Sequence, residues 1–459
     1  MTERIVVIGA DAAGMSAASQ AKRIAGDAIE IVAFDRGAYS SFSACGIPYW
    51  VAGDVDELER LVARSPDEHR RNGIDLRMRT EVEKIDLAAG RVLAHDLATG
   101  RSFQEGFDSL VIATGAVPVR PPLPGVDADG VFGVQTLDDG AALLADLRHT
   151  KPRQAVVVGG GYIGVEMAEA LVRRGVAVTV VDQAAQPMTT LDPDMGAAVH
   201  RAMEDIGIDV RTGTAVTGFE AGSDGRIRAV LTADGSLPAD VVVLGIGVRP
   251  NTALAHDAGL PLGDHGGLRT NMQMQVLGHD RVWAGGDCVE VLNLVSGQYQ
   301  HVPLGTHANK HGRVIGHNLA GSYATFPGVV GTAVSKVCHL EIARTGLRER
   351  DATRAGFAYV TVTVQSSTTA GYFPGAREMT VKMMAERLTG RLLGVQIVGY
   401  EGSAKRIDTA ATALWNRMTV EDMTALDLAY APPFAPVWDP ILVAARKAAA
   451  AVRQTGAAR

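Results

Sequence analysis

A chain of 459 residues with 21% charged residues and a net charge of −7 can form two or three domains, and it lacks the basic excess of nucleic-acid-binding proteins. Its three cysteines are too few for a secreted disulfide scaffold, so we expect a reducing, cytoplasmic location. No stretch approaches the roughly 20 apolar residues that span a bilayer, so we expect no membrane partner. No candidate metal ligands stand out.

The first 35 residues have the pattern of a β-turn-α-β nucleotide-binding unit. Two apolar runs, RIVVI and IEIVAF, are typical of buried parallel strands and flank a helix of small residues. In the first turn, Gly9 and Gly14 can bring backbone N–H groups toward a pyrophosphate, although Asp11 replaces the middle glycine. Asp35 ends the second strand, where an acid can bind a ribose.

The same pattern returns, complete, between residues 155 and 182. Gly159, Gly161 and Gly164 satisfy G-x-G-x-x-G between a strand and a helix, and Asp182 closes the next strand. This unit predicts a second dinucleotide site.

Two further apolar runs, VIATG at residues 111–115 and VWAGGDC at residues 282–288, also end in small turns. The second presents Asp287 after a strand, where an acid can bind a polyol. Residues 116–125 are rich in proline and predict a crossing between domains.

The pattern changes at about Tyr323. Residues 358–364 and 379–383 alternate as antiparallel strands do, and a helix is expected near residues 403–417. We therefore predict an α/β protein with two Rossmann-like domains and a C-terminal α+β domain.

Together these motifs resemble the FAD- and NAD(P)H-dependent pyridine nucleotide-disulfide oxidoreductases over nearly the whole chain. The resemblance implies a discontinuous FAD-binding domain at residues 1–115 and 251–322, and an NAD(P)H-binding domain at residues 116–250. It implies a dimerisation domain at residues 323–459, and hence a homodimer in which this domain completes the partner's active site.

The resemblance also assigns roles to individual residues. It implies FAD in the first unit, with Asp35 at its adenosine ribose and Asp287 at its ribityl chain. Tyr162 and Glu166 of GGGYIGVE resemble residues that gate and hold the nicotinamide. The residues expected to bind the two cofactors are Gly9, Ala13, Gly14, Asp35, Arg36, Ser43, Thr114, Gly115, Gly159, Gly161, Tyr162, Ile163, Gly164, Glu166, Asp182, Gly245, Gly247, Gly286 and Asp287.

The second cofactor is expected to be NADH, with NADPH as the alternative. Asp182 would repel a 2′-phosphate, and the next eight residues, QAAQPMTT, contain no Arg or Lys to bind one.

Cys45 is a lone thiol in the segment SFSACGIPYW. Larger family members use a C-x-x-x-x-C pair, but that spacing ends here at Trp50. Gly46 and Pro48 are typical of a helix start, and a helix N-terminus lowers the pKa of a thiol. The segment resembles the single-cysteine branch of the family, which holds coenzyme A-disulfide and CoA-persulfide reductases, NADH oxidases and NADH peroxidases. We therefore expect Cys45 to be redox-active.

The first glycine turn distinguishes members of this branch. Oxidases and peroxidases carry a histidine where this chain has Ala12 and Ala13. The small-residue turn is similar to that of the CoA-disulfide and persulfide reductases. This resemblance implies that Arg23 contacts the phosphates of CoA and that Ser41 binds substrate.

The C-terminal domain adds two tyrosines. Tyr372 of AGYFPGA and Tyr430 of AYAPPFAPVWDP match residues that reach the substrate from the partner subunit, where a phenol can protonate a leaving thiolate. Ala44 departs from the pattern, because CoA-disulfide reductases often have Asn there, and the substrate can therefore differ.

We thus expect an FAD-dependent enzyme that uses NAD(P)H to reduce a CoA-type disulfide or persulfide through Cys45, with CoA as substrate or Cys45 adduct. The alternatives are an NADH oxidase that forms a Cys45 sulfenic acid, a reductase of quinones or metal centres, and a redox sensor or electron carrier. Cys288 and Cys338 are expected to be buried in the core.

Overall fold

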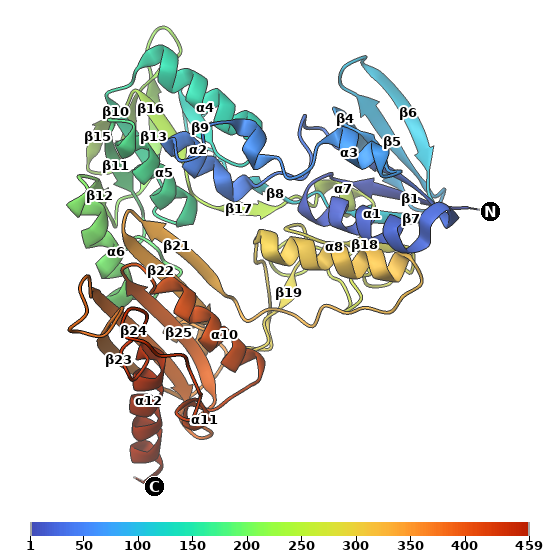
Figure 1. Cartoon of the computed structure of the whole chain (residues 1–459). Helices are drawn as coiled ribbons and strands as arrows, with labels where there is room; N and C mark the ends of the chain where they lie inside the picture. Colours follow the sequence, from blue (N-terminus) through green and yellow to red (C-terminus); the bar gives the residue numbers. More distant parts are fainter. Residues whose placement is uncertain (1, 458–459) are drawn as a thin grey trace.

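The computed structural model describes residues 2–457 and contains three five-stranded sheets (Figure 1). The first sheet is parallel, in the order β18-β7-β1-β2-β3. Its strands are β1 (Glu3–Ile8), β2 (Ile29–Phe34), β3 (Asp75–Arg77), β7 (Ser109–Ile112) and β18 (Val282–Ala284). Because β18 lies far along the chain, the first sheet is completed only after the chain has built the second.

Helices α1 (Ala12–Ala25) and α8 (Gly305–Leu319) pack side by side against the first sheet (Figure 1). A Cβ added to Gly312 would lie 2.3 Å from the carbonyl oxygen of Ala13, and one added to Gly316 would lie 2.6 Å from that of Ala17. The two glycines of α8 therefore allow the two helices to approach closely.

The second sheet is also parallel, in the order β12-β11-β10-β16-β9. Its strands are β9 (Val131–Gly133), β10 (Gln154–Val158), β11 (Ala177–Val181), β12 (Asp209–Arg211) and β16 (Val241–Leu244). Its helices are α4 (Leu137–Thr150), α5 (Tyr162–Arg173) and α6 (Pro193–Asp205). The short strands β8 (Ala116–Pro118) and β17 (Val248–Pro250) pair antiparallel where the chain enters and leaves this part.

The third sheet is antiparallel, in the order β21-β22-β25-β24-β23. Its strands are β21 (Ala333–Val337), β22 (Leu340–Gly346), β23 (Tyr359–Ser367), β24 (Glu378–Glu386) and β25 (Leu392–Gly399). The helices that accompany it are α9 (Glu349–Arg354), α10 (Ile407–Trp415), α11 (Val420–Met423) and α12 (Pro440–Ala457).

Smaller elements complete the chain. Two three-stranded antiparallel sheets comprise β4 (Thr80–Asp86), β5 (Arg91–Asp96) and β6 (Arg101–Gly106), and β13 (Val216–Ala221), β14 (Ile227–Thr232) and β15 (Gly235–Pro238). The others are α2 (Ile47–Ala52), α3 (Pro66–Arg71), α7 (Ala253–Asp257), β19 (Val291–Leu292) and β20 (Tyr299–Gln300).

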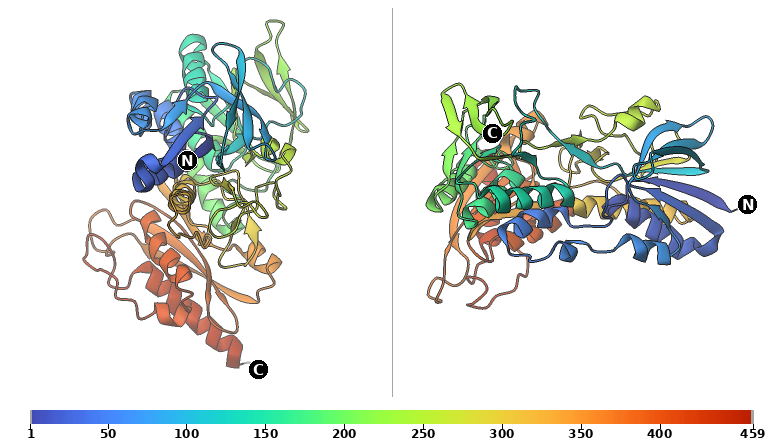
Figure 2. Two further views of the ribbon diagram at one scale, coloured as in Figure 1. Left: turned by 90° about the vertical axis from the view of Figure 1, so that its right-hand side faces the viewer. Right: turned by 90° about the horizontal axis from the view of Figure 1, so that it is seen from above.

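Each five-stranded sheet and its helices form one part of the molecule, and the three parts give it an angular shape. The first sheet lies at the right of Figure 1, the second at the upper left and the third below the second. Figure 2 gives two perpendicular views. The predicted fold class is confirmed. Within residues 2–457, the helices are all too short or too polar to traverse a lipid bilayer.

The two cysteines assigned to the core differ in outcome. Cys288 is fully buried, as predicted. The prediction for Cys338 is wrong, because this residue occupies the turn between β21 and β22, is only half-buried and has a φ of 48°. The alternation of SKVCHLEI continues across a turn that contains no glycine, proline or asparagine, so the sequence gives no signal of the reversal.

Candidate functional site

Both glycine turns lie at the carboxyl ends of central parallel strands, where α/β sheets bind ligands. In the first turn, Gly9 has a φ of 105°, and a Cβ there would lie 2.1 Å from the carbonyl oxygen of Ala113. A Cβ on Gly14 would lie 1.9 Å from the carbonyl oxygen of Gly9. Only glycine fits at either position, so the backbone forms the open cradle that a pyrophosphate requires.

Asp35 is fixed at this turn. Its Oδ2 accepts a 2.7 Å hydrogen bond from the N–H of Ala10, and its Oδ1 accepts one of 2.7 Å from the N–H of Gly37. The carboxylate is therefore held beside the cradle, where a ribose would follow a bound pyrophosphate.

The second turn repeats this geometry. Gly159 has a φ of 100°, and a Cβ on Gly164 would lie 1.8 Å from the carbonyl oxygen of Gly159. Gly161 caps α5, and Asp182 Oδ2 accepts a 2.6 Å hydrogen bond from the N–H of Gly160. The two units thus present the same cradle and the same acid, as the paired motifs predict.

The segment after β18 closes on the first turn. Gly286 has a φ of 83°, and a Cβ there would lie 3.1 Å from the Cβ of Ala13. Burial raises the pKa of the adjacent Asp287 to about 6. The structure therefore brings Ala13, Gly286 and Asp287 together, and the residues of the first site fit FAD.

His311 is a supporting residue that sequence reasoning missed. Its Nδ1 accepts a 3.1 Å hydrogen bond from the N–H of Gly286, and the ring packs edge-on against Phe326. Burial lowers the pKa of His311 to about 3, which keeps the acceptor nitrogen neutral. A histidine within an amphipathic helix gives no sequence signal for this role.

Some of the remaining predicted cofactor residues make structural contacts near the two glycine turns, and the others are described only by their position. Thr114 donates a 2.6 Å hydrogen bond to the carbonyl oxygen of Asn251, and Gly115 accepts one of 2.9 Å from the N–H of the same residue, so this pair joins the crossing strands. A Cβ on Gly245 would lie 2.8 Å from the Cα of Gly164. The others are Ile163 in the first turn of α5, Gly247 with a φ of 93°, and the exposed Arg36 and Ser43.

Cys45 lies in a 3₁₀ turn, Ala44–Gly46, that leads directly into α2. The residue is exposed, yet neighbouring protein displaces enough water from the thiol to raise its pKa, and the carboxylates of Glu166 and Asp287 raise it further. The expected lowering of the thiol pKa by the helix N-terminus is therefore wrong. Burial and two acids that lie far from Cys45 in the sequence raise the pKa instead.

Hydrogen bonds hold the Cys45 segment to the first glycine turn. Asp11 Oδ1 accepts a 3.0 Å bond from the N–H of Phe42, and the N–H of Ser41 donates a 3.1 Å bond to the carbonyl oxygen of Ala10. Ser41 has a φ of 47°, and its Oγ lies 3.0 Å from Nε2 of the buried His69. Sequence reasoning missed both Asp11 and His69, whose partners lie about 30 residues away in the chain.

Helix α2 packs against α5, so the Cys45 segment contacts the second nucleotide unit (Figure 1). Arg173 of α5 forms a two-pronged ion pair with Asp54, and Arg174 Nε donates a 2.6 Å hydrogen bond to the carbonyl oxygen of Val51. Cys45 lies within electrostatic range of both Glu166 on α5 and Asp287 after β18. The thiol thus lies near one acid from each of the two predicted cofactor sites.

Three predicted substrate-site residues lie elsewhere on the surface. Tyr372 and Tyr430 are 78% and 46% exposed. The two phenols are neighbours, and desolvation and a hydrogen bond with Tyr372 raise the pKa of Tyr430. Arg23 is exposed and bonds to Gln20 at 3.0 Å. Within residues 2–457, no hydrogen bond or stacked contact joins any of the three to the Cys45 segment of its own chain.

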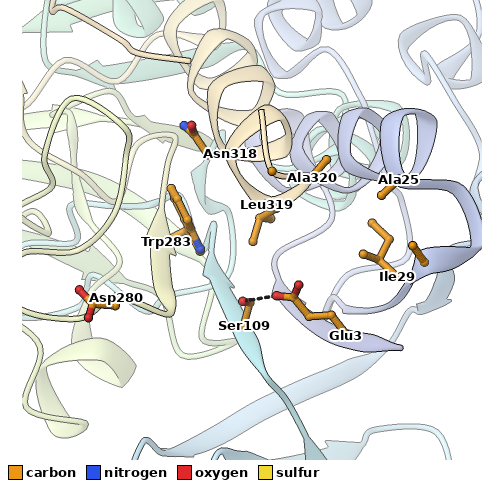
Figure 3. Close-up of a pocket in the computed structure, with 11 residues that line it drawn as sticks. Glu3, Ala25, Ile29, Ser109, Asp280, Trp283, Asn318, Leu319 and Ala320 are labelled. Carbon is orange, nitrogen blue, oxygen red and sulfur yellow. Dashed lines mark hydrogen bonds between the residues drawn. The ribbon is translucent and has the colours of Figure 1, made fainter. Parts of the chain in front are cut away.

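A shallow pocket opens at the opposite end of the first sheet (Figure 3). Its lining includes Glu3 and Ser109, joined by a 2.7 Å hydrogen bond, together with Trp283 and Leu319. Glu3 and Ser109 begin β1 and β7, Trp283 lies on β18, and Leu319 ends α8, so the pocket is away from both glycine turns. The pocket is therefore separate from the candidate active site.

Comparison with known proteins agrees with this geometry. Residues 3–312 match the pyridine nucleotide-disulphide oxidoreductase family, and residues 332–440 match the dimerisation domain of that family. The chain belongs to this family. Its fold and its use of FAD and NAD(P)H are those predicted from the sequence.

Several members of the family are similar along nearly the whole of this chain. The NAD(P)H sulfur oxidoreductase (CoA-dependent) of Pyrococcus abyssi is 39% identical over 96% of this chain and 97% of its own. A protein named NADH oxidase from Methanocaldococcus jannaschii is 36% identical over 97% of this chain and 98% of its own. The crystal structure of reduced CoADR-RHD from Bacillus anthracis superposes with a TM-score of 0.95 at 34% identity, covering 99% of this chain and 81% of that one.

Proposed function

We propose that this oxidoreductase uses NADH to reduce a CoA-type disulfide or persulfide through FAD and the single thiol of Cys45. The observation that carries the proposal is the position of Cys45. Cys45 is exposed and lies just before α2. Its segment is bonded to the first glycine turn through Phe42, and α2 packs against α5, the helix of the second glycine turn. The CoA dependence named for the Pyrococcus relative supports the substrate class.

Each cofactor has a complete set of candidate contacts. The first glycine turn would hold the FAD pyrophosphate, with Asp35 at the adenosine ribose and Asp287 at the ribityl chain. The second turn would hold NADH, with Asp182 at its ribose and with Tyr162 and Glu166 at the nicotinamide. Bound FAD supplies the two-electron carrier between NADH and the thiol.

The chemistry of the thiol follows thiol–disulfide exchange. The Cys45 thiolate attacks one sulfur of a CoA disulfide, so that a new Cys45–CoA disulfide forms and the other CoA leaves as a thiolate that takes up a proton. Two electrons from NADH then break the Cys45–CoA bond, which frees the second CoA and restores the Cys45 thiolate. A persulfide would release hydrosulfide in the corresponding step.

We propose that residues distant from Cys45 in the sequence donate the proton and bind the phosphates of the substrate. We propose that Tyr372 and Tyr430 of the partner subunit supply the proton to the leaving thiolate in a homodimer. Arg23 lies about 17 Å along α1 from its first residue, a separation that suits an extended ligand whose phosphates are remote from its thiol, as in CoA. Ser41 would contact the same ligand near Cys45.

We also propose the domain limits given by the motifs: FAD binding at residues 1–115 and 251–322, NADH binding at residues 116–250, and dimerisation at residues 323–459. The pairing of β8 with β17 at the two crossings supports these limits.

The substitution Cys45→Ser tests the function. We expect reduction of the flavin by NADH to stay within about twofold of the parent, and reduction of CoA disulfide or persulfide to fall by about 1,000-fold or more. Cys338→Ser is the matched control and should leave both rates unchanged. Undiminished disulfide turnover in Cys45→Ser would refute the proposal. Oxygen uptake that matches NADH consumption and requires Cys45 would instead identify an NADH oxidase.

A further inference from the structure

Helix α5 presents one stripe of residues to the third sheet. Tyr162, Glu166 and Glu169 are spaced four and three residues apart, which places them on the same face over two turns. The β21–β22 hairpin of the C-terminal part contacts every member of this stripe. The predicted nicotinamide residues are thus held from outside their own nucleotide unit.

The two carboxylates of the stripe are bound by the first strand of the hairpin and its turn. Ser335 Oγ donates a 2.8 Å hydrogen bond to Glu166 Oε1. The N–H of Cys338 donates a 2.8 Å bond to Glu169 Oε2, and Lys336 lies 3.7 Å from the other oxygen of this carboxylate. These contacts fix the hairpin along α5.

The third contact is made by Arg344 on the second strand. Its Nε donates a 3.3 Å hydrogen bond to the phenol oxygen of Tyr162. Ser335 pairs with Ile342, so Arg344, two residues further along β22, lies on the same face of the hairpin as Ser335. The pleat of the sheet therefore directs both donors at α5.

Tyr162 is the first residue after the capping Gly161, so its ring stands at the helix N-terminus where a nucleotide binds. We propose that Arg344 is a positioning residue that holds Tyr162 in its NADH-free position, so that the C-terminal part controls access of the nicotinamide. This inference rests on the proposed NADH site. When NADH enters, the ring turns and the bond from Arg344 is released.

This role predicts that removing the bond makes binding easier. In Arg344→Gln the ring of Tyr162 can turn aside for NADH without breaking a hydrogen bond. The Kd for NADH should therefore fall by about 3- to 10-fold. The rate of flavin reduction at saturating NADH should stay within about twofold, because Arg344 touches neither reacting group. A general loss of structure would change both quantities.

The experiment is a double-mutant cycle on the FAD-loaded enzyme with Arg344→Gln, Tyr162→Phe and the combined variant. Anaerobic stopped-flow absorbance of the flavin gives the Kd for NADH and the limiting rate, and calorimetry gives the Kd for NAD⁺, which transfers no electrons to the oxidised flavin. Both single variants should lower the Kd by similar factors, and the double variant should equal either one. Arg344→Lys, which retains one donor, should lie nearer to the parent.

A matched control is Arg269→Gln, which removes a different arginine–tyrosine contact, the stacking of Arg269 at 3.7 Å on Tyr299. It should not change the Kd. An unchanged or higher Kd in Arg344→Gln, or additive effects in the cycle, overturns the inference. If Arg344→Gln does not fold, Tyr162→Phe removes the same bond from the other side. Failure of NADH to reduce the parent flavin would refute the proposed function, while the NAD⁺ measurement would still test Arg344.

Discussion

Asp11 and Phe42 are joined by a hydrogen bond of 3.0 Å, donated by the backbone N–H of Phe42 to the side-chain Oδ1 of Asp11. Asp11 is the residue that breaks the first glycine motif, and Phe42 precedes Cys45 by three positions. Although Asp11 caps α1 by position, its carboxylate makes no cap bond with that helix. The departure from the motif therefore gives the Cys45 segment an anchor.

The negative charge of Asp11 lowers the free energy of unfolding by an amount that can be measured. Burial raises its pKa from 3.8 to about 6, and the charges of Asp35 and Asp287 add to this shift although the bond from Phe42 opposes it. A raised carboxyl pKa means that the folded state binds the proton more tightly, so the stabilising contribution is present at low pH and is lost as the pH rises through about 6. The shift corresponds to about 3 kcal/mol at pH 7.

We therefore expect Asp11→Asn, which keeps an acceptor for Phe42, to raise the free energy of unfolding at pH 7 by up to about 3 kcal/mol. Urea denaturation between pH 4 and pH 7 should show a flatter pH dependence than the parent. Asp27→Asn is the control, because the Asp27 side chain is fully exposed and should change stability by less than about 0.5 kcal/mol. Equal pH profiles for Asp11→Asn and the parent would contradict the assignment.

The sequence predicts those parts of the fold whose signals are local. The run RIVVI and the turn with Gly9 and Gly14 identify a buried strand and its ligand-binding end because every residue of the signal is adjacent in the chain. The sequence does not predict strand β6 (Arg101–Gly106), because Phe103 is its one bulky apolar residue and its pairing comes from β5.

In the candidate site too, the local features can be predicted from the sequence and the contacts between distant segments cannot. Cys45 is proposed as the redox thiol from its own segment alone. Its raised pKa depends first on burial and then on Glu166 and Asp287, which lie more than 100 residues away in the sequence. The anchor from Asp11 and the support from His311 likewise require the fold to bring distant segments together. Sequence patterns can propose the reactive atom but not the burial and charges that surround it.

Lys382 provides a test of how the second and third parts are joined. Its side chain on β24 is 6% exposed and lies 3.3 Å from Asp192, 2.7 Å from Asp194 and 3.1 Å from Glu349. Burial alone would lower its pKa, but the hydrogen bond to Asp194 and the other carboxylates raise it above the ordinary value. The ammonium is therefore charged and neutralises acids from α6 and α9.

Replacing Lys382 by Met leaves these carboxylates without their partner, and we expect the free energy of unfolding to fall by about 3–5 kcal/mol. Chemical denaturation followed by circular dichroism measures the change. Lys405→Met is the control, because the Lys405 side chain is 82% exposed beside Asp408 and such pairs contribute about 0–1 kcal/mol. Similar losses in both variants would show that the buried cluster does not join the two parts.

Asp182 is expected to determine the choice of nicotinamide cofactor. Its carboxylate is held by the N–H groups of Gly160 at 2.6 Å and Ala184 at 2.8 Å, so the charge cannot move away from a 2′-phosphate. Combining Asp182→Ser with Gln183→Arg should raise the ratio of kcat/KM for NADPH to that for NADH by about tenfold or more. Steady-state kinetics with both cofactors measures the ratio, and a constant ratio would place the ribose elsewhere.

Mixed dimers can decide whether Tyr372 and Tyr430 act on the partner's Cys45. A Cys45→Ser subunit retains both tyrosines, and a subunit with Tyr372→Phe and Tyr430→Phe retains the thiol. If the tyrosines act across the dimer, combining the two inactive variants creates one intact site per mixed dimer, with about half of the parent disulfide turnover. If they act within one chain, the mixture stays as slow as its components. The refolded mixture is assayed for NADH-dependent reduction of CoA disulfide, with the unmixed variants as controls, and no gain on mixing would exclude completion of the site by the partner subunit.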